Sequence, residues 1–206
     1  MKIFSLNRTI SIIIWSQCVF FTIGILVFSI GIQVYQVEGI SGYSLLYLLM
    51  LSPGLIFSRK IGQVVDGNNI FKTVRNSIIL LLIISFFIIN FDSLFFYYFV
   101  SALISILVQV VSITTSSSIS IATSPDKMNK AQGLQTSTSG IIYIITPIIS
   151  NTFLNYQSFY ILGIICCLSY LILLLTLCLI GPYFTHTHKN NGYNKDSVTF
   201  VEKGFF

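Results

Sequence analysis

Three long stretches of this chain are built from apolar and small polar residues and contain no lysine or arginine. They cover residues 9–58, 76–126 and 131–188 and are 50, 51 and 58 residues long. A helix needs about 20 apolar residues to cross the hydrocarbon core of a bilayer, which is roughly 30 Å thick. Each stretch is therefore too long for one crossing and suits two. The pattern predicts an all-α, polytopic membrane protein with six transmembrane helices.

A short polar turn divides each stretch. The turns lie at 36–42, 90–93 and 155–158, and they carry Glu38 and Asp92 but no basic residue. The six predicted spans then cover about 9–35, 42–57, 76–89, 94–123, 132–153 and 159–180. We expect residues 58–75 to form a loop. Residues 1–182 make up the predicted membrane domain, and the polar residues 183–206 a flexible cytoplasmic tail.

The amino-acid composition also indicates a membrane protein. Hydrophobic residues make up 54% of the sequence and charged residues 8%, and the mean hydropathy is +0.87. These values exclude an ordinary soluble domain. The net charge of +5 is then explained by loops that face anionic lipid, so nucleic acid is not an expected partner.

The basic residues give the predicted bundle an orientation. All eleven fall into four groups that flank the apolar stretches: Lys2 and Arg8; Arg59, Lys60, Lys72 and Arg75; Lys127 and Lys130; and Lys189, Lys195 and Lys203. Positive charge is retained on the cytoplasmic side of a membrane. We therefore expect a multi-pass protein of the cell (inner or plasma) membrane with both termini in the cytoplasm.

Polar and small residues recur at helical spacing in two of the predicted spans. In the first span they include Gln17, Gly24 and Gly31; in the fifth they include Gln132, Gln135, Thr136, Ser139, Tyr143, Thr146 and Pro147. Isoleucines cover the opposite side of the fifth span. The polar side must therefore face either neighbouring helices or a water-filled pathway, and the sequence leaves both open. Gln109 in the fourth span is a further candidate for such a face.

The second half of the fourth span is rich in hydroxyl groups. Seven Ser and Thr residues lie between Ser112 and Ser120. Each hydroxyl can bond to the carbonyl one turn earlier, so lipid does not exclude them. They either line a cavity or allow tight packing through small side chains. We favour packing because the hydroxyls go round the whole helix.

Residues for enzymatic chemistry are missing from the predicted spans. No His, Asp, Glu, Lys or Arg lies well inside any of them, so intramembrane acid–base catalysis and metal binding lack their side chains. His186 and His188 lie in the predicted tail, and two histidines alone are more consistent with solvated residues than with metal ligands. We expect no enzyme, no cofactor and no metal.

One segment resembles a known family. In SPGLIFSRKIGQVVDGNNIFKTVRNS, Gly62 stands four positions before Asp66, and Lys72 and Arg75 follow. This resembles the loop between spans two and three of the major facilitator superfamily, whose signature is a Gly, three residues, an Asp and then Arg or Lys. VYQVEG, SPGL and NKAQGLQ with Pro147 look like the branch of macrolide and drug exporters. Gly67 departs from the pattern, since the family has Arg directly after the Asp.

The resemblance extends over about residues 12–177 and implies half of a transporter. Family members have twelve spans in two six-helix halves, and this chain looks like the amino-terminal half. Gly62, Asp66, Lys72 and Arg75 would then belong to a cytoplasmic gate. The implied function is secondary-active efflux of small molecules of unidentified nature, together with a second half, either another copy or a separate partner. The alternative is a truncated or decayed paralogue without transport activity, persisting as a structural or binding membrane protein.

Overall fold

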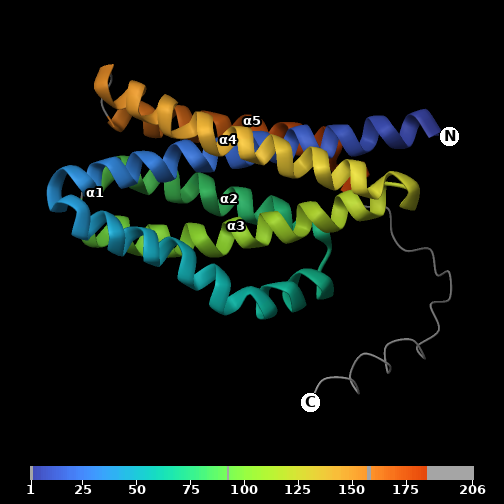
Figure 1. The fold of residues 1–206 in the computed structure, drawn as a ribbon, viewed down its shortest axis with the longest axis horizontal. Coiled ribbons are helices and arrows are strands. Elements are labelled where there is room, and N and C mark those ends of the chain that lie inside the picture. Colours follow the sequence, from blue (N-terminus) through green and yellow to red (C-terminus); the bar gives the residue numbers. More distant parts are fainter. Residues whose placement is uncertain (1, 92, 157–158, 185–206) are drawn as a thin grey trace, which may run out of the picture.

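The computed structural model describes residues 2–91, 93–156 and 159–184 of the chain, and the elements in these ranges are helices. In chain order they are α1 (Lys2–Gly67), α2 (Ile70–Asn90), α3 (Leu94–Ala122), the short 3₁₀ helix η1 (Pro125–Lys127), α4 (Met128–Tyr156) and α5 (Phe159–Phe184). They run side by side along the long axis of one bundle (Figure 1). Five of these helices are long and apolar enough to cross a membrane, which indicates a membrane protein.

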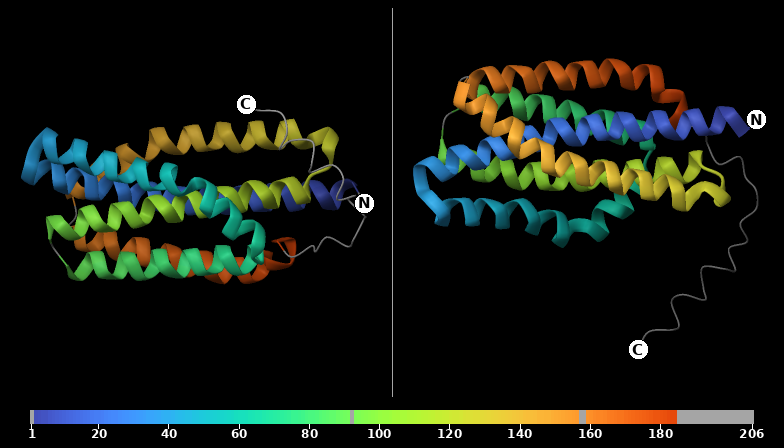
Figure 2. Two further views of the ribbon diagram at one scale, coloured as in Figure 1. Left: turned by 90° about the horizontal axis from the view of Figure 1, so that it is seen from below. Right: turned by 45° about the horizontal axis from the view of Figure 1, so that its top comes forward.

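Helix α1 reverses its direction at Gly39. The backbone there has φ 67° and ψ −152°, a conformation open to glycine because it lacks a Cβ. The first arm (2–38) and the second arm (40–67) consequently run antiparallel (Figure 2) and contact each other near the reversal. The Tyr43 ring lies 3.0 Å from the position that a Cβ on Gly31 would occupy. The reversal falls within the turn predicted at 36–42.

The second arm is longer than the sequence predicted. A loop was expected over 58–75, but α1 continues to Gly67 and α2 already begins at Ile70. Only Asn68 and Asn69 separate them, and the Asn69 side chain caps α2 by accepting a hydrogen bond from the N–H of Phe71 at 3.0 Å. The charge of Arg59 and Lys60 predicts a loop, but both residue types favour helices. A helix can also continue beyond the hydrocarbon core, so a charged residue does not have to end it.

The other two turns lie where the sequence predicted them. Helix α2 ends at Asn90 and α3 begins at Leu94, while α4 ends at Tyr156 and α5 begins at Phe159. Asp92 lies outside the described residues. So does most of the predicted tail, including His186 and His188.

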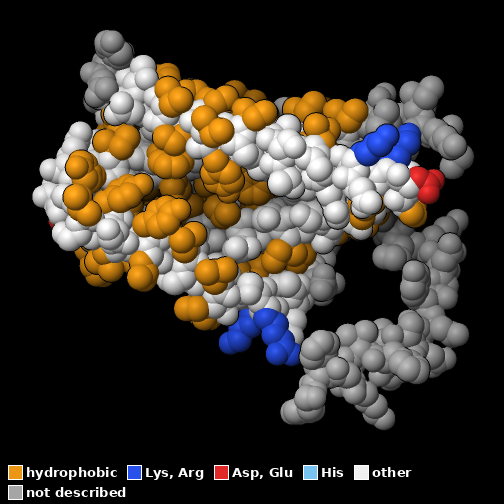
Figure 3. Space-filling view, in the orientation of Figure 1, with side chains coloured by type: hydrophobic (Ala, Val, Ile, Leu, Met, Phe, Trp, Pro, Cys, Tyr) orange, Lys and Arg blue, Asp and Glu red, His pale blue; other side chains and the backbone are white. Residues whose placement is uncertain are grey.

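Small polar residues share the interior with a larger set of apolar ones, and large apolar residues also cover the outside. Ser29, Ser85 and Ser118 are buried, and their hydroxyls donate to carbonyls one turn earlier at 2.7, 2.9 and 2.7 Å. Phe95 and Leu179, by contrast, are 81% and 79% exposed. Figure 3 shows hydrophobic side chains spread over the side of the bundle. A surface of this kind suits lipid and is unfavourable in water.

The hydroxyl-rich half of α3 serves mainly to pack helices together. Thr114, Thr115 and Ser118 are buried, and α3 lies chiefly along α1. The Thr114 hydroxyl donates to the carbonyl of Val110 at 2.6 Å. This agrees with the packing interpretation of these residues, whereas Ser112 lines a small cavity described below.

Candidate binding cavity

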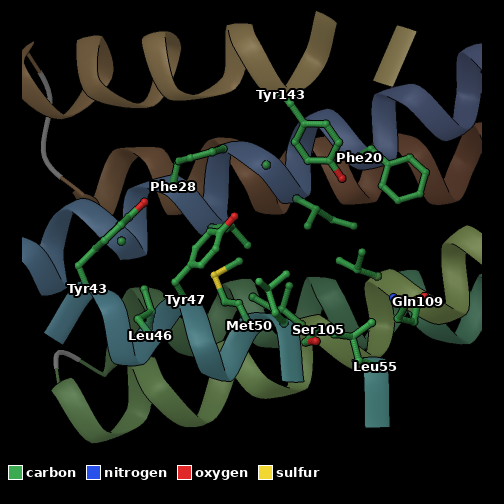
Figure 4. A pocket seen from close by; sticks show the side chains of 17 residues that line it. Phe20, Phe28, Tyr43, Leu46, Tyr47, Met50, Leu55, Ser105, Gln109 and Tyr143 are labelled. Atoms are coloured by element: carbon green, nitrogen blue, oxygen red, sulfur yellow. The ribbon is translucent and has the colours of Figure 1, made fainter. Parts of the chain in front are cut away.

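A cavity of about 320 Å³ lies between the two arms of α1, α3 and α4. Its wall is mostly aromatic and aliphatic, and Figure 4 shows Tyr143 reaching in from α4 while Tyr47 and Met50 point in from the second arm of α1. Two further polar side chains, Ser105 and Gln109, come from α3. None of the described residues that line the cavity is charged. The cavity thus offers a large apolar surface and a few hydrogen-bonding groups.

The cavity opens onto the surface of the bundle. Tyr143 and Leu55, which stand on different sides of it, are 63% and 66% exposed. A smaller cavity of about 190 Å³ adjoins it and shares Phe20, Val108, Gln109 and Tyr143. Gln135 and Ser139 of α4 line this second space. The structure therefore brings together four candidates from the sequence: Gln109, Gln135, Ser139 and Tyr143.

Gln17 ties the first arm of α1 to α4. It is buried, and its Nε2 donates to the carbonyl oxygen of Gln135 at 3.3 Å and to Ser139 Oγ at 3.1 Å. Burial of an amide requires such partners. Gln17 is consequently a packing residue, next to the smaller cavity rather than in its wall.

The remaining candidates divide between packing and the exterior. Thr146 is fully buried against Gly24, and Pro147 is half-buried beside it. Gly24 and Gly31 both pack closely against a neighbour and line the larger cavity. Gln132 and Thr136 are exposed and line neither cavity.

Pro53 and Gly54 position the two polar residues of α3. Proline in a helix removes a hydrogen bond and bends the chain. The N–H of the next residue, Gly54, donates to Ser105 Oγ at 3.0 Å. A Cβ on Gly54 would lie 2.8 Å from Gln109 Cγ, so only glycine admits α3 this closely. No local feature of the sequence indicates that Ser105 is the partner of this pair.

Apart from Ser105, the residues of the larger cavity that the sequence did not single out are aliphatic or aromatic. Phe20, Tyr47 and Met50 resemble any other residue of a membrane span, and only the arrangement of the helices turns them toward a shared space.

At the end of the bundle where α1 reverses, Tyr98 of α3 donates a hydrogen bond to the carboxylate of Glu38 of α1. This bond holds the reversal of α1 against α3.

Three residues of the expected gate are described in full, and they lie on two helices. Gly62 lies in the second arm of α1, and no atom comes within 4 Å of the position of a Cβ there. No neighbouring helix packs closely against this glycine. Lys72 and Arg75 are exposed on α2. The Asp66 side chain is outside the described part of the structure.

The fold and the cavity define a multi-helical membrane protein with an uncharged internal binding space. Within residues 2–91, 93–156 and 159–184 there is no group of three or more His, Cys, Asp or Glu side chains that would hold a metal ion. Comparison of the chain with protein-family models, with curated proteins and with solved structures gave no match.

Proposed function

We propose that the bundle is one half of a secondary-active transporter for small molecules, similar to the efflux branch of the major facilitator superfamily. The observation that carries this proposal is the uncharged cavity of about 320 Å³ between α1, α3 and α4. Its volume lies in the range of small-molecule sites, which are mainly apolar and carry few polar groups. Ser105 and Gln109 would supply the polar contacts, and the tyrosines aromatic surfaces.

The arrangement of the helices supports the orientation inferred from charge. Counting the two arms of α1 separately gives six passes along the bundle. The start of α1, the α1–α2 junction and the α3–α4 connection lie at one end, and the reversal of α1 lies at the other (Figure 1). Three of the four basic groups belong to that first end. We infer that it faces the cytoplasm, in a cell membrane and with both termini inside.

A second bundle would complete the pathway. Because the cavity opens onto the side of the bundle, a solute in it would contact lipid unless another protein surface covered the opening. A second copy of this chain or a separate partner would provide that wall, as repeated halves do in secondary transporters. Cross-linking followed by mass measurement distinguishes these assemblies from a monomer.

The transport proposal is tested by filling the cavity. We expect cells that express the chain in a host without its own drug exporters to accumulate less of at least one compound in a panel of fluorescent amphipathic dyes and a macrolide. Met50→Trp should abolish this difference, because the indole occupies the cavity. Leu179→Trp, on the exposed surface of α5, is the control and should retain it. Equal accumulation with and without the wild-type chain would refute transport by a pair of identical chains, and the separate partner would then be required.

One observation favours the alternative of a structural or binding membrane protein. No atom lies within 4 Å of the Cβ position of Gly62, and the exposed Lys72 and Arg75 lie on another helix, an arrangement that also suits a bundle without a gate. A chain that stays monomeric and moves none of the compounds would support this second function.

A further inference from the structure

A separate groove lies at the end of the bundle that carries the basic groups. It has a volume of about 310 Å³ and runs between the beginning of α1 and the connection from α3 to α4. It shares no lining residue with the cavities described above. The transport proposal does not account for it.

One wall of this groove is apolar. Ile13 is buried, while Ile10 and Leu134 are partly exposed toward the outside of the bundle. The three side chains come from α1 and α4, so the wall follows the join between two helices. An acyl chain lying along it would remove apolar surface from water or from less well packed lipid.

The other side of the groove is cationic. Lys127 is half-buried and Lys130 is exposed, and both line the groove. Residues three apart at the start of a helix lie on one face. The only acidic residue in this connection, Asp126, is exposed, and no ion pair joins it to either lysine in the described part of the chain. Charged side chains of both signs are visible at this end of the bundle in Figure 3.

Hydroxyl groups close the groove between the two lysines and α1. Thr9 Oγ1 and Thr123 Oγ1 lie 3.0 Å apart, and Thr9 also donates to the carbonyl of Ala122 at 3.4 Å. The beginning of α1 is thereby held against the end of α3. Ser124, next along the chain, is exposed in the groove wall and adds a neutral hydrogen-bonding group.

We propose that this groove binds an anionic glycerophospholipid. The phosphate contacts Lys127 and Lys130, and one acyl chain lies along Ile10, Ile13 and Leu134. Lysines near a membrane surface attract anionic lipid, and the apolar wall adds affinity that a free anion does not receive. A phosphatidylcholine headgroup places its own positive charge, the choline group, near the lysines. It therefore binds less well than an anionic headgroup. The site is independent of the transport proposal.

The test is a titration of the purified full-length chain in detergent with dioleoylphosphatidylglycerol, followed by native mass spectrometry. Lys127→Gln combined with Lys130→Gln should weaken binding about tenfold or more. The matched control, Arg59→Gln with Lys60→Gln, removes the same charge from the exposed second arm and should change binding less than about twofold. Lys127→Arg with Lys130→Arg keeps the charge and should retain the lipid.

A second arm distinguishes lipid from a free anion. Ile10→Gln introduces a polar group into the apolar wall and should weaken binding of the lipid about threefold, an effect of the size expected for losing part of an apolar contact. sn-Glycerol 3-phosphate at millimolar concentration should not displace the lipid. Displacement by glycerol phosphate, equal loss in both charge-removing pairs, or unchanged binding in the lysine pair would each overturn the proposal. Circular dichroism confirms that each variant is helical, and Lys130→Gln alone repeats the test if the pair misfolds.

Discussion

At the scale of single residues, the contact between Gly24 and Thr146 sets how closely the first arm of α1 approaches α4. Thr146 Cγ2, Cβ and Oγ1 lie 2.8, 3.2 and 3.2 Å from the position of a Cβ on Gly24. Rotation of the threonine does not relieve this crowding, because a branched side chain places another atom in the same space. The Thr146 hydroxyl also donates to the carbonyl of Ile142 at 2.9 Å, which holds its rotamer. Helices in membranes commonly approach each other through such small residues.

Gly24→Ala should therefore destabilise the bundle. We expect a loss of about 1–3 kcal/mol, the usual range for overpacking a close contact. Gly133→Ala is the control, since no atom lies within 4 Å of its Cβ position and alanine favours helix. The measurement is thermal unfolding in detergent. Combining Gly24→Ala with Thr146→Ala should recover much of the loss, and a double variant as unstable as Gly24→Ala alone would contradict the assignment.

At the scale of elements, the second arm of α1 is held to α3 at its bend and diverges beyond it. Ser105 accepts the N–H of Gly54, and Gly54 is buried. The residues that follow, Leu55, Ile56 and Phe57, are exposed. Leu55, which directly follows Gly54, is one of the exposed residues that line the larger cavity.

Ser105→Ala should destabilise the contact between the second arm of α1 and α3. The effect should exceed that of replacing a serine whose hydroxyl bonds only within its own helix. The Gly54 N–H would be left without its partner in a buried position, at a cost of about 1–3 kcal/mol. Ser101→Ala is the matched control, because the Ser101 hydroxyl only supplements a carbonyl of its own helix, that of Tyr97. Hydrogen exchange at the Gly54 amide should accelerate in the first variant and stay unchanged in the second. Equal exchange in both would show that the bond does not hold the bend.

At the scale of the whole molecule, charge and apolar surface divide the bundle along its long axis. The connections that carry basic residues share one end, and Glu38 at the reversal of α1 lies at the other. Between the ends the outside is covered by large apolar side chains (Figure 3). The proposed orientation, with the basic end in the cytoplasm, rests on this division.

Cysteine labelling tests that orientation. In a background with Cys18, Cys166, Cys167 and Cys178 replaced, we expect Ile40→Cys to react with a membrane-impermeant maleimide on intact cells. Lys60→Cys should react only after the membrane is permeabilised, because it lies at the basic end. Both positions are exposed, so access alone does not separate them. Labelling of Lys60→Cys in intact cells, with Ile40→Cys protected, would reverse the proposed topology.

Much of the fold followed from local features of the sequence, whereas little of the site did. The breaks at 90–93 and 155–158 and the reversal at Gly39 were predictable, because polar and glycine residues interrupt long apolar runs. The helix through Arg59 and Lys60 was not, since charge marks the limit of the lipid core rather than the end of a helix. Gln109 and Tyr143 were found as polar residues within spans. Met50 and Phe20 carried no such signal.

The sequence by itself determined that the chain is helical, where the breaks at 90–93 and 155–158 fall, and that isoleucines cover an exposed side of α4. These properties depend on apolar length and on a period that every helix shares. Only the tertiary structure decided that Gln17 and Thr146 pack while Gln109 and Gln135 face open space. A polar stripe satisfies its hydrogen bonds equally well against a helix or in a cavity. The choice depends on the neighbouring helices: the close contact with Gly24 buries Thr146, and Gln135 and Ser139 of α4 supply the partners of Gln17.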